Sequence, residues 1–288
     1  MLDTSDPKNE GAVGELWRRD EFKVLMKVLK RLPPEERNIE GLFNVVSSGV
    51  LYGDTIGGYD PSDLRDFLIQ YVSLLVAHRV GDPSKKGVYR RFRDSCLADE
   101  HSAVVTFNYD LVVEPLLEFV YGGFDYGLPK QPKFRYFRLR GARRGPPLLK
   151  LHGSLSWLAC GSCHSVWMHD TYAIHKAGSR CLRSSCSGLL RPPIVPPMWN
   201  KEATAKEISI IWAMARGLLV RSQRIVVIGF SFPPLDRAAI DLMRSVLRDN
   251  PRIRVDVYNG PNYDYAALRT MLGRKLRNTG GKLEDLTG

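Results

Sequence analysis

The most constraining feature of the sequence is a pair of apolar segments near its carboxyl end, with helix-like stretches beside them. The segment 224–232 (RIVVIGFSF) is short, continuous and β-branched, as buried strands are. A helical stretch at about 201–221 precedes it, and another at 236–248 leads into a second strand-like segment at 252–260. Strands that alternate with helices are typical of a parallel sheet covered by helices on both faces.

The same alternation extends through the middle of the chain. Strand-like segments occur at 102–106 (SAVVT) and 148–152 (LLKLH), and 133–140 is interpreted as an exposed strand or a hairpin arm. Helical spacing of apolar residues covers three earlier stretches, 15–31, 61–80 and 84–98. The sequence therefore predicts an α/β fold with a doubly wound parallel sheet and a helical module at about 38–98.

Composition and charge limit the kinds of protein and partner that fit this chain. Hydrophobic residues make up 44% of the 288 residues, which is enough for a sizeable core. The chain contains no run of about 18 or more apolar residues, and charges occur throughout its amino-terminal segment, so we expect a soluble, cytoplasmic protein without a membrane partner. Its 42 basic and 31 acidic residues give a net charge of +11, which favours a polyanionic partner, either nucleic acid or a phosphorylated cofactor.

Four of the five cysteines form two pairs with the spacing of metal ligands. Cys160 and Cys163 are separated by two residues, and Cys181 and Cys186 by four. The thiols of a cytosolic protein stay reduced, so the pairs favour a metal over disulfides. Four thiolates can close a tetrahedron around zinc and stabilise a loop that lacks a core of its own. A histidine of the same segment in place of Cys186 is the alternative: His164, His169 or His175.

Polar residues lie at the carboxyl ends of four predicted strands, where an open parallel sheet forms its ligand crevice. Asn108 and Asp110 follow the first of these strands, and a turn that leads into a helix cap is their alternative interpretation. His152 ends the second strand, and with an unperturbed pKa near about 6.5 it can accept a proton at neutral pH. The other two strand ends carry Gly229, Ser231 and Asn259. Together they predict a converging binding site.

Six motifs, taken in order, resemble those of the sirtuin family, and most closely its divergent bacterial branch, which is linked to NAD-consuming defence. They are TFNYD at 106–110, LHG at 151–153, the two cysteine pairs, LLRPPIVPP at 189–197, IVVIGFSFPPLD at 225–236 and VYNG at 257–260. The resemblance covers about residues 100–260. It implies a Rossmann-like NAD-binding domain, formed by 1–157 and 191–288, around an inserted zinc-ribbon module at 158–190.

The resemblance also implies roles for the residues at the strand ends. The expected reaction is cleavage of the bond between nicotinamide and ribose, with His152 and Asn108 as catalytic residues. Asn108 would position the ribose or an attacking water, and Asp110 would help to hold the carboxamide. The other cofactor-binding residues that the resemblance implies are Thr106, Gly229, Ser231 and Asn259. NAD and a structural zinc are the expected ligands.

We expect hydrolysis of NAD in bacterial anti-phage defence. The segment PPIVPPMWNK lacks the Phe-Gly-Glu that helps to form the peptide channel of deacylating sirtuins. One alternative is NAD-dependent deacylation of protein lysines. Another is a catalytically silent module that binds nucleotide, nucleic acid, a protein partner or further copies of the chain in a homo-oligomer.

One feature of the family has no counterpart in the sequence. Sirtuin-like proteins open with an apolar strand and a Gly-Ala-Gly-x-Ser loop, whose backbone amides bind the pyrophosphate. The only candidate here is EGAVGELW, with Gly11 and Gly14, and the preceding MLDTSDPKNE cannot form a buried strand. We expect the first strand and its loop to be missing because the start is truncated, since loss of a central strand leaves unpaired backbone groups on both neighbours. The alternative is that the loop is absent and NAD binding is impaired.

Overall fold

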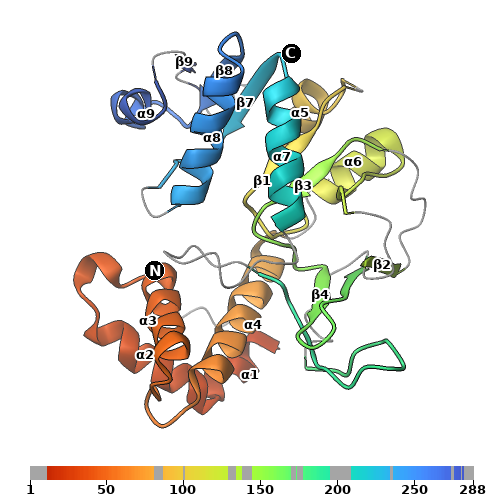
Figure 1. Ribbon diagram of the computed structural model, residues 1–288. Helices are drawn as coiled ribbons and strands as arrows, with labels where there is room; N and C mark the ends of the chain where they lie inside the picture. Colours follow the sequence, from red (N-terminus) through yellow and green to blue (C-terminus); the bar gives the residue numbers. More distant parts are fainter. Residues whose placement is uncertain are drawn as a thin grey trace.

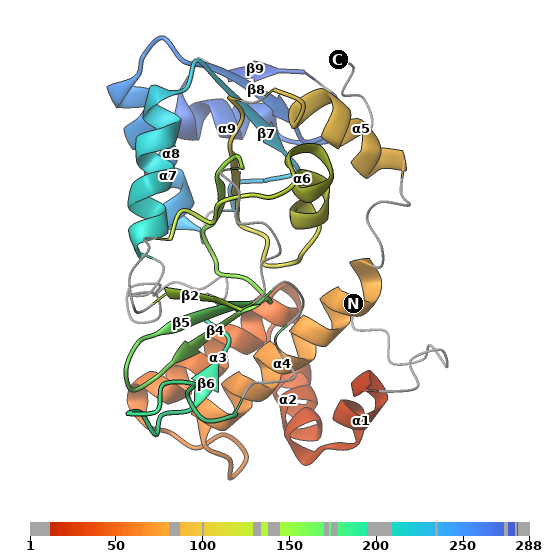
Figure 2. The same ribbon diagram turned by 90° about the vertical axis from the view of Figure 1, so that its right-hand side faces the viewer.

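The computed structural model describes residues 12–80, 87–99, 101–128, 134–137, 145–169, 173, 178–194, 209–233, 236–273, 276–279 and 281. Figures 1 and 2 show the parallel strands with their helices at one end of the molecule. A cluster of amino-terminal helices and a small β-sheet lie at the other end. Parts of several predicted segments lie outside the described residues: Gly11, 138–140, His175, 195–197 and 201–208.

Two parallel sheets form the end of the molecule that carries the polar strand ends. One sheet has the order β7 (Arg224–Ile228), β8 (Arg254–Tyr258), β9 (Leu276–Asn278), and the other pairs β1 (Val104–Thr106) with β3 (Leu148–Lys150). The helices of this end are α5 (Gly87–Cys96), α6 (Val113–Tyr121), α7 (Ser209–Arg221), α8 (Arg237–Asp249) and α9 (Tyr265–Leu272). The prediction of an α/β fold with parallel strands is confirmed.

The two parallel sheets share one hydrophobic core. Leu148 and Leu149 of β3 are fully buried in the same cluster as Val255 and Val257 of β8. Helix α8 adds Val246 from its apolar face, as expected for an amphipathic helix that covers a sheet. Each such side chain contributes roughly 1.5–3 kcal/mol of transfer free energy when it is fully buried. The core therefore fixes the strand ends of both sheets relative to one another.

The amino-terminal helices pack around a second core. They are α1 (Ala12–Arg18), α2 (Asp20–Arg31), a 3-10 turn at Pro34–Glu36, α3 (Ile39–Tyr52) and α4 (Pro61–Val80). The sequence predicts one helix over 15–31, but the backbone is extended at Arg19 and divides it in two. Gly14, a candidate for a phosphate loop, lies inside α1. No helix of the described residues is long and apolar enough to cross a membrane.

A four-stranded sheet carries the cysteine-rich segment. Its order is β2 (Phe134–Phe137), β5 (Val166–His169), β4 (Trp157–Cys160), β6 (Leu190–Arg191), with β4 antiparallel to both neighbours. Leu158, Trp167 and Leu190 form a small core with the cysteines. The predicted boundaries stay predictions: 1–157 and 191–288 for the Rossmann-like domain, 158–190 for the cysteine module and about 38–98 for the helical module.

One buried carboxylate holds the β7–β8 pair together at its amino end. Asp256 of β8 is 0% exposed, and its two oxygens accept hydrogen bonds from the Nε atoms of Arg224 (2.7 Å) and Arg254 (3.0 Å). Burial alone would raise the pKa of this carboxyl, but the hydrogen bonds from Arg254 and Arg224 lower it below its usual value. The ionised form of Asp256 is therefore part of the folded state.

We predict that Asp256→Asn destabilises the protein by about 1–3 kcal/mol at pH 7, because it removes two charge-assisted hydrogen bonds. A carboxyl with a lowered folded pKa contributes stability above its unfolded pKa of about 3.9 and loses it as pH falls through the folded pKa. The difference between native protein and variant should therefore shrink below about pH 4. Urea denaturation at pH 7 and at acid pH measures this difference in the free energy of unfolding.

Asp241→Asn is the matched control for this experiment. Asp241 lies on the surface of α8, where it pairs with Arg237 at 3.1 Å. Surface ion pairs contribute about 0–1 kcal/mol, so this variant should stay close to the native protein at both pH values. A difference for Asp256→Asn that persists unchanged at acid pH would contradict the prediction.

Candidate functional site

The carboxyl ends of the strands converge through aromatic contacts. Phe107, directly after β1, stacks on Phe230, which lies two residues after the end of β7, with ring centroids 4.1 Å apart. Phe107 also meets the ring of His152 edge to face at 5.2 Å. The side chain of Asn259, after β8, donates to the carbonyl of Phe230 at 2.7 Å. These three contacts thus link all four predicted strand ends in one series.

The loop after β1 is ordered by its own side chains. Thr106 Oγ1 accepts a hydrogen bond from the backbone N–H of Asn108 at 3.0 Å. Asp110 Oδ1 accepts one from the N–H of Val112 at 3.0 Å, as a turn before a helix requires. Asn108 itself is exposed at the head of this loop. The local turn was one interpretation of these residues, and their roles toward a ligand stay a prediction.

The loop after β7 is held from β8 and from the segment that follows it. Gly229 has a positive φ of 65° and lets the chain turn at the strand end. Its backbone N–H donates to the carbonyl of Tyr258 at 3.1 Å. Ser231 is exposed, and its carbonyl accepts a hydrogen bond from the hydroxyl of Tyr263 at 2.5 Å. Both predicted residues therefore lie in an ordered turn at the carboxyl edge.

His152 is delivered to this edge by β3 and is only 5% exposed. The next residue, Gly153, has a φ of 84°, and a Cβ there would lie 2.0 Å from the carbonyl oxygen of Pro193. Glycine is thus required for the turn that follows the histidine. Trp212 of α7 donates its indole N–H to the carbonyl of Leu151 at 2.9 Å and so fixes the backbone just before it.

A carboxylate that the motif analysis did not single out faces the histidine. Asp236 Oδ2 lies 3.5 Å from His152 Nε2, and both side chains are more than nine-tenths buried. Asp236 is the N-cap of α8, and its Oδ1 accepts from the N–H of Ala239. The sequence signal for the cap was an aspartate directly before an amphipathic helix, but the pairing with His152 depends on tertiary structure.

A buried lysine ties the strand of the histidine to the loop of Asn108. Lys150, at the end of β3, is 1% exposed, and its Nζ donates to Glu114 Oε1 at 2.6 Å and to the backbone carbonyl of Asp110. Tyr126 donates to the same carboxylate oxygen at 3.1 Å and contacts Ser156 Oγ at 3.3 Å. Burial raises the pKa of Tyr126 well above its usual value, so its hydroxyl stays protonated.

We predict that Lys150→Met destabilises the protein by about 3–5 kcal/mol, because it leaves the Glu114 carboxylate buried without its cation. The double variant Lys150→Met/Glu114→Gln should recover part of this loss, since it removes the orphaned charge. Lys23→Met is the control, because Lys23 forms an exposed pair with Asp20 at 2.7 Å. Urea denaturation of the variants measures the free energies of unfolding. Equal effects for Lys150→Met and Lys23→Met would contradict the prediction.

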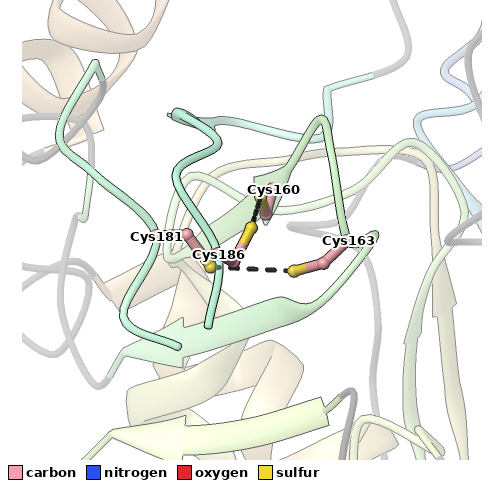
Figure 3. Close-up of side chains that lie close together, drawn as sticks. All are labelled: Cys160, Cys163, Cys181 and Cys186. Atoms are coloured by element: carbon pink, nitrogen blue, oxygen red, sulfur yellow. Dashed lines mark hydrogen bonds between the residues drawn. The ribbon is translucent and has the colours of Figure 1, made fainter. Parts of the chain in front are cut away.

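The four paired cysteines come together in one cluster (Figure 3). Their Sγ atoms lie within 4.8 Å of one another, with 3.6 Å between Cys160 and Cys186 and 3.7 Å between Cys163 and Cys181. Tetrahedral bonds of about 2.3 Å from one zinc ion would place sulfur atoms about 3.8 Å apart. Among the described residues the cluster contains Cys186 and neither His164 nor His169.

The surroundings of the cluster shift the pKa values of its cysteines in different directions. Burial opposes ionisation of Cys163, but hydrogen bonding with Ser165 lowers its pKa to about 6. Burial raises the pKa of Cys181 to about 11. Gly188 passes close to the cluster, because a Cβ there would lie 2.6 Å from Cys160 Sγ. A cation is what would let all four thiols ionise together.

Comparisons with known proteins point to one group of structures. No protein-family model and no curated protein matches the sequence. Among solved structures, the chain is similar to a Sir2 homologue in complex with NAD, with 17% identity over 75% of this chain and 68% of that chain and a TM-score of 0.42. A point mutant of a Sir2 homologue with ADP-ribose shares 16% identity over 78% and 72% of the two chains, with a TM-score of 0.46.

A triple mutant of Sir2 homologues with 2'-O-acetyl ADP-ribose shares 18% identity over 80% of this chain and 77% of that chain, with a TM-score of 0.43. These proteins are Sir2 homologues, the family whose motifs the sequence resembles. With TM-scores below 0.5, any function has to be derived from the residues of the chain itself.

Proposed function

We propose that the chain is a sirtuin-like enzyme that binds NAD and cleaves the bond between nicotinamide and ribose. The observation that carries the proposal is the convergence of His152 with the loops of Asn108 and Ser231 at the carboxyl edge of the parallel strands, through Phe107 and Phe230. That edge is where open α/β sheets bind nucleotides. The imidazole of His152, the exposed amide of Asn108 and the carboxylate of Asp110 lie on the loops that meet there.

The residues suit hydrolysis of a cationic glycoside. Nicotinamide leaves as a neutral molecule when the C–N bond breaks and its electron pair stays on the ring nitrogen, so no acid is needed. The oxocarbenium-like ribose is then attacked by water, whose proton must be removed as the new C–O bond forms. His152 would accept this proton, and the Asn108 amide would orient the water or the ribose. The products are nicotinamide, ADP-ribose and a proton.

Hydrolysis is proposed in preference to lysine deacylation because the segment PPIVPPMWNK lacks the Phe-Gly-Glu that follows the corresponding valine in deacylating sirtuins. We further propose bacterial anti-phage defence as the setting, on the motifs TFNYD and PPLD alone. Gly14, which belongs to the candidate phosphate loop, lies within α1 and not between a strand and a helix.

We predict that purified protein releases nicotinamide from NAD and that Asn108→Ala and His152→Ala each lower kcat by about 10²-fold or more, as loss of a general base or a positioning group does. His101→Ala is the control, because this exposed histidine pairs only with surface Asp99 in the contacts described for it. Chromatography of free nicotinamide measures the rate. Binding of NAD without release would favour the silent nucleotide-binding module, and equal rates in all three variants would contradict the assigned residues.

We also propose that Cys160, Cys163, Cys181 and Cys186 hold one structural zinc ion. The sulfur separations fit a closed tetrahedral site, and two of the four thiols are buried. Bound zinc would stabilise the fold of the cysteine module and supply no open coordination position for a substrate. The thiols must lose their protons to bind it, so affinity for zinc should fall as pH falls.

We predict about one zinc per chain, lost together with the folded cysteine module in Cys181→Ser. Removing one of four thiolates opens the tetrahedron and leaves a small core without its main support. Cys96→Ser is the control, because Cys96 lies on α5 outside the cluster. Metal analysis and thermal unfolding measure the two effects. Native protein without zinc, or Cys181→Ser that melts like the native protein, would overturn the zinc site.

A further inference from the structure

The two oxygens of Asp236 have different partners. Oδ1 caps α8 by accepting the N–H of Ala239 at 3.3 Å, while Oδ2 lies 3.5 Å from His152 Nε2. The side chain of Asp236 is 3% exposed and that of His152 is 7% exposed, so little water screens the pair. The amino end of α8, where the carboxylate sits, also stabilises negative charge. The aspartate thus reaches from a helix terminus to the histidine.

We propose that Asp236 is a positioning residue that holds His152 in the tautomer with the proton on Nε2. This inference rests on the proposed function, in which His152 accepts a proton from water. A carboxylate next to Nε2 favours the Nε2–H form, because an ionised carboxylate can only accept a hydrogen bond. The lone pair then lies on Nδ1, the nitrogen that takes up the proton during the reaction. Asp236 also stabilises the imidazolium that results.

The rest of the histidine's surroundings limit its rotation. The ring of Phe107 meets the imidazole edge to face at 5.2 Å, and the ring of Trp212 lies 6.3 Å from it. The indole N–H of Trp212 fixes the carbonyl of Leu151 just before the histidine. A separation of 3.5 Å is longer than an ordinary hydrogen bond, and such contacts often tighten when substrate binds. The Asp236 carboxylate is therefore close enough to act on Nε2.

A purely structural role for Asp236 is the competing explanation, and asparagine separates the two. Asparagine caps helices about as well as aspartate, so Asp236→Asn should keep the start of α8. With its oxygen on Ala239, its NH₂ group would face Nε2 and donate to it, which moves the imidazole proton to Nδ1. Asp264→Asn is the matched control, because Asp264 caps α9 in the same way, accepting the N–H of Ala267 at 2.9 Å.

In the kinetic experiment, Asp236→Asn should lower kcat for nicotinamide release by about 10²- to 10⁴-fold, since the same change in a Ser-His-Asp triad lowers kcat about 10⁴-fold through the wrong tautomer. KM should change by less than about 3-fold, and the melting temperature should stay near that of the native protein. Asp264→Asn should leave kcat unchanged. A kcat for Asp236→Asn that matches Asp264→Asn would overturn the proposal.

A spectroscopic experiment tests the proposal independently of activity. The ¹⁵N shifts of the imidazole report which nitrogen carries the proton, and His152→Gln identifies the signal among the six histidines. We expect Nε2–H in the native protein and Nδ1–H in Asp236→Asn. Nδ1–H in the native protein would overturn the role of Asp236 even if the variant fails to fold. Native protein with the expected tautomer but no release of nicotinamide would instead overturn the proposed function.

Discussion

The site depends on one buried ion pair. An ammonium group as deeply buried as that of Lys150 is unfavourable unless its donors are satisfied, and here Glu114 and the carbonyl of Asp110 accept them. Glu114 lies on α6 and Lys150 on β3, so both elements and the loop between β1 and α6 must be in place together. The pair thus anchors the loop at Asp110, two residues from Asn108. The buried ion pair of Lys150 and Glu114 thus helps to determine the geometry of the site.

The second constraint is the junction between the two parallel sheets. The described strands β1 and β7 belong to different sheets, and the stack of Phe107 on Phe230 connects their carboxyl ends. Aromatic rings at this distance add about 0.5–1.5 kcal/mol beyond the area that they bury. His152 lies against the same stack, so its surroundings are apolar on the side of Phe107. The carboxylate of Asp236 lies 3.5 Å from the imidazole Nε2, and little water screens this pair.

Local patterns in the sequence predicted the elements that are long or strongly periodic. The strands at 224–228 and 254–258 and the helices beside them follow from apolar runs and helical spacing, and the cysteine cluster follows from spacing alone.

Periodicity did not predict α3, because Gly41, Gly49 and two serines weaken it. The helix forms through its Asn38 cap and its packing. Helix α9 and strand β9 are short, and neither helical spacing nor an apolar run predicted them. The pairs Lys150–Glu114 and His152–Asp236 join residues far apart in the chain, so no local pattern contains them.

A short segment of the chain connects His152 to the cysteine module. Only Gly153 to Ser156 separate His152 from β4, the strand that ends in Cys160. Within this short link the N–H of Leu155 donates to the carbonyl of Tyr109 at 2.9 Å, and Ser156 contacts Tyr126 of the lysine network. Leu155 also packs into the core of the amino-terminal helices. Loosening β4 would therefore release the link that orders both the Asn108 loop and the turn after His152.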